Sequence, residues 1–101
     1  MVKDKFLIKC KLYKSSDMIY FSQLDLAKIL ERALRRTKLP VCYTEGFNPR
    51  VKLSFGKALK LGVEGSEEVT FYFLKPVDIT DFITTLGKQL PSGLQLLPIK
   101  D

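Results

Sequence analysis

The segment 43–50, "YTEGFNPR", crowds an acid, an amide and a guanidinium between a glycine and a proline. Asn48 and Pro49 are typical of the first two positions of a tight turn, and Gly46 suits a residue with positive φ. The same polar groups can also bind an anion or a nucleic acid. The segment is therefore either a sharp loop or a binding site.

The two interpretations assign different contacts to the same side chains. In the first interpretation, the segment is a sharp loop that leads into the second strand, with Phe47 available to fill the core and Glu45 available to pair with Arg50. As a site, it joins "RALRR", which is expected to end the preceding helix. Arg35, Arg36 and Arg50 then converge, and the planar fork of arginine binds phosphate through two hydrogen bonds at once.

The sequence offers few residues that could catalyse a reaction or bind a metal. Histidine is absent, which excludes a Ser-His-Asp triad, a Cys-His dyad and a histidine metal site within the chain. Cys10 and Cys42 lie far apart and are interpreted as small buried hydrophobes, so no metal or other cofactor is expected. Asp25, Glu31 and Glu45 remain as acid–base candidates, but no nucleophile stands beside them. A non-catalytic role is favoured over an enzyme.

Length, charge and hydropathy indicate the number of domains, the kind of partner and the compartment. The 101 residues carry a net charge of +6, with 14 Lys and Arg against 5 Asp and Glu in residues 1–60. We expect one domain, residues 1–101, with an anionic partner for its first part. No apolar run is long enough to cross a membrane, and the charged start lacks the apolar core of a signal peptide. These features predict a cytoplasmic protein without a membrane partner.

The elements that position these residues can be predicted from periodicity. Residues 5–14 alternate as a strand, with one apolar side and one mostly polar side: Phe6, Ile8, Cys10 and Leu12 against Lys5, Lys9, Lys11 and Tyr13. Residues 22–36 predict a helix with a capping box at Ser22 and Asp25. Its apolar stripe is Leu26, Ala27, Leu30, Ala33 and Leu34, and Glu31 stands four positions before Arg35.

The second half of the chain continues the pattern. Strands are predicted at 51–55 and 69–73, then a helix capped by Asp78 or Thr80, and a last strand at 94–99. The helix contains Phe82, Ile83, Leu86 and Leu90. The order strand, helix, strand, strand, helix, strand is the split βαβ pattern. We therefore expect an α+β, ferredoxin-like fold, a four-stranded antiparallel sheet with two helices on one face.

That fold leaves the other face of the sheet open. The residues expected on it mix cations with aromatic rings: Lys9, Lys11, Tyr13, Lys52, Ser54, Thr70 and Tyr72. RNA-recognition modules stack bases on such a face. A plain solvated face is the alternative.

A long stretch of the chain resembles the radical SAM-linked domain family. The motifs that carry the resemblance are "S-x-LDL", "ERALRR", "LP-x-x-Y-x-EGFNP", "K-x-SF" and "LGVE". Members are mostly uncharacterised and are often fused to, or encoded beside, radical SAM proteins. The resemblance implies an accessory role near RNA modification or processing.

The chain departs from that family at two positions. The usual "SHLD" has Gln23 in place of its histidine, and the usual "GFNPHPK" reads Arg50-Val51-Lys52. This chain therefore cannot use those histidines for proton transfer or metal binding, which favours a binding or scaffolding role. The three-cysteine iron–sulfur motif of a radical SAM enzyme is absent as well, so such chemistry belongs to another chain.

The leading hypothesis is a non-catalytic accessory domain that binds RNA, either tRNA or rRNA, for a modifying or processing enzyme. Cations would neutralise phosphates, Phe47 or Tyr43 would stack a base, and Asn48 would read a base edge or hold the turn. The runner-up is a domain that docks onto a radical SAM protein without RNA. The candidate nucleic-acid-binding residues are Arg32, Arg35, Arg36, Tyr43, Glu45, Phe47, Asn48, Arg50 and Lys52.

Overall fold

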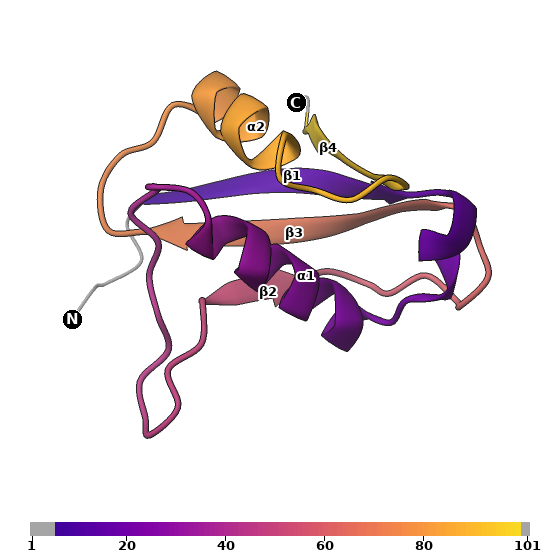
Figure 1. Cartoon of the computed structure of the whole chain (residues 1–101), viewed down its shortest axis with the longest axis horizontal. Coiled ribbons are helices and arrows are strands. Elements are labelled where there is room, and N and C mark those ends of the chain that lie inside the picture. Colours follow the sequence, from indigo (N-terminus) through magenta and orange to yellow (C-terminus); the bar gives the residue numbers. More distant parts are fainter. Residues whose placement is uncertain (1–5, 100–101) are drawn as a thin grey trace.

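The structure, a computed structural model, describes residues 6–99. Its elements, in chain order, are β1 (Phe6–Lys14), the 3-10 helix η1 (Ser16–Tyr20), α1 (Gln23–Arg35), β2 (Leu53–Phe55), β3 (Gly65–Phe73), α2 (Ile79–Gly87) and β4 (Leu94–Pro98) (Figure 1). The four strands form one sheet in the order β2-β3-β1-β4, with every neighbouring pair antiparallel. The predicted ferredoxin-like α+β fold is confirmed.

Alternation along β1 and β3 separates the two faces of the sheet. On β1, Ile8, Cys10 and Leu12 are buried, whereas Lys9 and Lys11 are exposed. Inward residues of β3 lie opposite inward residues of β1, since Cys10 pairs with Val69 and Ile8 with Phe71. The predicted inward and outward sides of this strand are confirmed. Lys5 is the exception, because it is not among the described residues.

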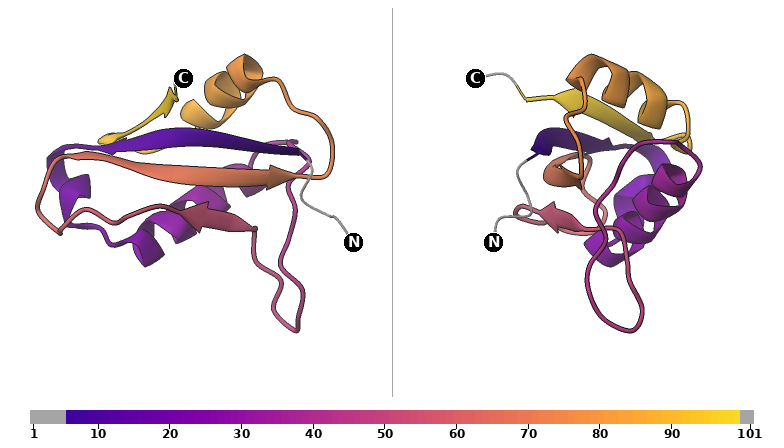
Figure 2. Two further views of the ribbon diagram at one scale, coloured as in Figure 1. Left: turned by 180° about the vertical axis from the view of Figure 1, so that it is seen from behind. Right: turned by 90° about the vertical axis from the view of Figure 1, so that its left-hand side faces the viewer.

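Both helices cover the inward face of the sheet (Figure 2). Leu26 and Leu30 of α1 lie in the same apolar core as the inward strand residues. From α2, the ring of Phe82 packs edge-on against Phe71 and Phe73, with centroids 4.8 and 5.4 Å apart. Such aromatic pairs contribute about 0.5–1.5 kcal/mol beyond the area that they bury.

Local signals place the helix starts as expected. The Ser22 side chain accepts from Asp25 N, and the Asp25 carboxylate accepts from Ser22 N, which confirms the capping box of α1. The Asp78 side chain accepts from Asp81 N and caps α2. None of the helices in residues 6–99 is long and apolar enough to cross a membrane.

Two strands differ in extent from the predictions, and one short helix was not predicted. β3 begins at Gly65 and not at Val69, because residues 65–68 pair with the second half of β1. These four residues are a glycine and three polar residues, so they lack the alternating apolar pattern of a strand. β2 has three residues, because Val51 forms a bridge with Tyr43 instead of extending β2. The 3-10 helix η1 was not predicted.

The two cysteines are buried as expected, and burial raises the pKa of Cys10 to about 11.

Candidate nucleic-acid interface

Residues 43–51 form an arm that projects from the body of the domain (Figures 1 and 2). The two sides of the arm are held together at its base. Thr44 N donates to Arg50 O at 2.7 Å, Arg50 N donates to Thr44 Oγ1 at 3.0 Å, and Tyr43 forms a bridge with Val51. Gly46 near the tip has a φ of +124°, the conformation that favours glycine. The arm is thus a hairpin held by hydrogen bonds, the chain bends at residues 46–48 near its tip, and the positive φ expected for Gly46 is confirmed.

The tip of the arm presents an aromatic ring to solvent. Phe47 is fully exposed, so the interpretation in which it fills the core is wrong. The physical reason is the hairpin, whose paired base carries the tip away from the sheet. Glu45 and Asn48 are exposed beside it. A ring in this position can stack on a planar ligand without any rearrangement of the core.

At the base of the arm, two arginines share one carboxylate. Arg50 donates to Glu31 Oε1 from Nε at 2.8 Å and from Nη2 at 2.6 Å, and Arg35 Nη2 donates to Glu31 Oε2 at 2.8 Å. The Glu31 side chain is 10% exposed, whereas those of Arg35 and Arg50 are 50% and 54% exposed. The expected ion pair between Glu45 and Arg50 is wrong, because α1 places Glu31 directly against Arg50.

This arrangement keeps Glu31 ionised. The hydrogen bonds from Arg50 lower the pKa of Glu31 to about 2, assisted by Arg35 and opposed by burial. At neutral pH the cluster holds two guanidinium charges and one carboxylate charge. It is therefore a cationic surface with a fixed geometry, and its carboxylate is poorly suited to accept or donate a proton.

The predicted convergence of three arginines is correct for two of them. Arg35 and Arg50 meet at Glu31, and the guanidinium of Arg35 also lies over the ring of Tyr43, 5.5 Å from its centre. Arg36 turns toward the end of α2, where its Nε and Nη2 donate to Gln89 Oε1 and O at 3.0 and 3.2 Å. This difference arises because consecutive helical positions lie about 100° apart around the axis.

The remaining cationic candidates lie on other surfaces. Arg32 is exposed on the outer side of α1. Lys52 belongs to the open face of the sheet, where its ammonium lies 5.0 Å from the centre of the Tyr72 ring. The Tyr72 hydroxyl is 2.8 Å from Ser54 Oγ, and the Tyr13 hydroxyl donates to Glu64. The open face therefore has its predicted composition, but Lys52 and Ser54 already contact Tyr72.

Residues 8–101 match the family described as "Uncharacterized protein conserved in bacteria (DUF2344)". The chain belongs to this family. Comparisons with curated proteins and with solved structures found no match. The expected membership of an uncharacterised family is confirmed, whereas the link of DUF2344 to radical SAM proteins stays a prediction.

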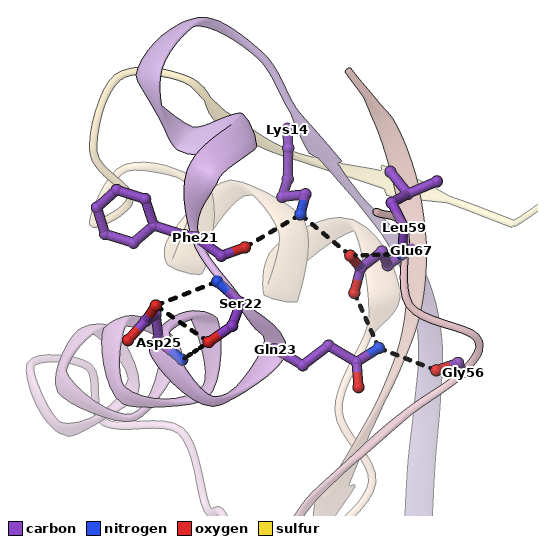
Figure 3. A network of polar contacts seen from close by, with 8 residues as sticks. All are labelled: Lys14, Phe21, Ser22, Gln23, Asp25, Gly56, Leu59 and Glu67. Carbon is purple, nitrogen blue, oxygen red and sulfur yellow. Dashed lines mark hydrogen bonds and ion pairs between the residues drawn. The ribbon is translucent and has the colours of Figure 1, made fainter. Parts of the chain in front are cut away.

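The DUF2344 chain also contains a buried ion pair that was not predicted (Figure 3). Lys14 and Glu67 have exposed fractions of 0% and 2%, and Lys14 Nζ lies 3.2 Å from Glu67 Oε2. Lys14 Nζ also donates to Phe21 O at 3.1 Å, and Leu59 N donates to Glu67 Oε2 at 3.1 Å. Strand alternation would have found both positions, because Lys14 follows Leu12 inward and Glu67 precedes Val69.

Gln23 extends this network toward the second strand (Figure 3). Its Nε2 donates to Glu67 Oε1 and to Gly56 O, both at 2.9 Å. Gln23, at the position where the resemblance leads us to expect a histidine, therefore uses both amide hydrogens, which one nitrogen of a neutral histidine could not supply. Among residues 6–99, every buried side-chain nitrogen or oxygen has a hydrogen-bond partner. We interpret the network as architectural, because it joins β1, α1, β3 and the segment before β3.

Proposed function

We propose that this DUF2344 chain is a non-catalytic accessory domain that binds single-stranded regions of RNA, in tRNA or rRNA, through its arm. The observation that carries the proposal is the fully exposed ring of Phe47 at the tip of a hydrogen-bonded hairpin. An aromatic side chain in this position contributes nothing to the core. Proteins that bind single strands use such rings as stacking platforms next to cationic grooves.

The charges at the base of the arm support the same proposal. Arg35 and Arg50 are half exposed and are held by Glu31, so their guanidinium groups are oriented before a ligand arrives. Prior orientation lowers the entropy cost of binding. The engaged carboxylates favour binding over catalysis, because Glu31 is tied to both arginines and Asp25 caps α1.

The test is an RNA titration that compares two exposed aromatic residues. Phe47→Ala should weaken binding of a fluorescein-labelled single-stranded oligoribonucleotide by about 1–3 kcal/mol, the contribution of one stacked base. Its melting temperature and the slope of log affinity against log salt should stay unchanged. Tyr20→Ala is the matched control, since Tyr20 is an exposed ring in η1, at the other end of the sheet from the arm (Figure 1).

Wild-type protein that binds no RNA at low salt would refute this function. It would promote the second candidate, a domain that docks onto a radical SAM protein without RNA. One observation favours that candidate: Leu24, in the first turn of α1, is 68% exposed next to the half-buried Leu53 and Phe55. Co-purification of the tagged chain with a radical SAM protein after ribonuclease treatment would support docking.

A further inference from the structure

A groove runs between α1 and the segment 50–56. Two contacts mark its ends: Gln23 Nε2 donates to Gly56 O at 2.9 Å, and Arg50 binds Glu31. The helix rise of 1.5 Å per residue places Gln23 and Glu31 about 12 Å apart along α1. Between these ends lies a cavity of about 220 Å³.

The two ends of the groove differ in chemistry. Its walls toward the Gln23 end are apolar and come from both elements: Leu24, Ala27, Leu53 and Phe55. Ala27, Leu53 and Phe55 are half-buried and Leu24 is exposed, so the apolar surface is open to a ligand. At the other end, Arg50 and Glu31 line the cavity.

The polar end carries a net positive charge. Glu31 is ionised and neutralises one of the two guanidinium groups that it binds. Lys28 is exposed one turn before Arg32 and lies on the helix face beside Leu24 and Arg35. An occupant that complements the groove therefore has a flat apolar part and an anionic part at one end. A nucleotide has both.

We propose that this groove holds one nucleotide of a single-stranded RNA, with the base against the apolar walls and its phosphate at Arg50 and Arg35. The proposal rests on the proposed function and adds a second contact to it. The arm tip stacks one base, and the groove takes another base of the same strand. Affinity then depends on the ring at the arm tip, on the apolar walls of the groove and on the cationic end of the groove.

The first test fills the groove without changing any charge. Ala27→Leu adds bulk at a half-buried helical position and should weaken binding of a fluorescein-labelled oligouridylate at least about fivefold, with an unchanged salt slope. Thr85→Leu is the matched control, because it adds similar bulk to an exposed position of α2. Melting curves of both variants report whether each one folds.

A second variant covers the case in which Ala27→Leu fails to fold. Leu24→Glu replaces an exposed wall residue in the first turn of α1, where a negative charge suits the helix. It should also weaken RNA binding at least about fivefold, because it removes apolar surface from the wall against which the base lies and adds a negative charge beside an anionic strand.

The outcomes separate the groove from the arm. If Phe47→Ala weakens RNA binding but the folded groove variants bind as wild type does, the groove proposal is overturned and the proposed function stands. If wild-type protein binds no RNA, both are overturned. If both groove variants and Phe47→Ala weaken binding while the α2 control does not, both proposals are supported.

Discussion

Removing the ammonium of Lys14 should be among the most damaging single changes in this fold. Lys14→Met keeps the length of the side chain but leaves the Glu67 carboxylate with only Gln23 and Leu59 as donors. It also removes the donor to Phe21 O. Both Lys14 and Glu67 are almost fully buried, so water does not replace the lost partner. Breaking a buried pair from one side costs about 3–5 kcal/mol.

The expected loss is large compared with the stability of a domain of this size. Small domains have unfolding free energies of about 5–15 kcal/mol, and 1 kcal/mol shifts the melting temperature by about 4–8 °C. Lys14→Met should therefore lower the melting temperature by at least about 12 °C. Urea unfolding followed by circular dichroism would give the free energy directly.

A double-mutant cycle isolates the pair from its surroundings. Glu67→Gln keeps the shape of the acceptor but leaves the Lys14 charge buried, so it should also destabilise the fold. The double variant should lose less than the sum of the two single losses, by about 1–3 kcal/mol. If Lys14→Met lost less than about 1 kcal/mol, the range of an exposed ion pair, the reasoning would be refuted.

Four further substitutions test the ion pairs at the base of the arm, two glycines and the ring at the arm tip. The pKa of Glu31 falls from its ordinary 4.5 to about 2 on folding, so its stabilisation is present above about pH 4.5 and disappears as the pH falls toward 2. The difference in stability between wild type and Glu31→Gln should shrink over that range in pH-dependent urea titrations. Gly93→Ala should cost more than about 1 kcal/mol, since Gly93 has φ +96° and an added Cβ would lie 2.8 Å from Ser15 O. Gly87→Ala, with nothing within 4 Å of the added Cβ, should be neutral or stabilising in the same thermal melts. Phe47→Ala should melt as wild type does, because its ring is fully exposed, and a marked loss would show that the ring packs against the fold.

The fold was predictable because most of its signals are local. Alternation in β1, the capping box at Ser22 and Asp25 and the apolar stripe of α1 each depend on spacings within a few residues. The order of the elements then leaves few topologies, since crossovers are short and right-handed. β3 was predicted four residues too short because its first half, Gly65–Glu68, carries a glycine and polar side chains yet pairs fully with β1.

The candidate site was less predictable, because its contacts join residues that are distant in the sequence. Glu45 and Glu31 are both plausible partners for Arg50 in the sequence, and only the packing of α1 against the arm selects Glu31. An aromatic residue in "EGFNP" is equally compatible with a core and with a tip, and the hairpin pairing decides between them. The buried pair of Lys14 and Glu67 was missed because long charged side chains are expected outside.

The geometry of the arm also bears on how this domain can change. Its two sides leave the body as a paired unit, with Lys52 N bonded to Cys42 O at 2.9 Å and Thr44 N to Arg50 O at 2.7 Å. The segment between them is exposed and packs against nothing in the apolar core. Exposed tips that begin and end at the same place tolerate insertion and replacement. Residues 45–49 are therefore a natural graft point, at which a peptide of different length or recognition can be installed while the remainder of the chain folds as before.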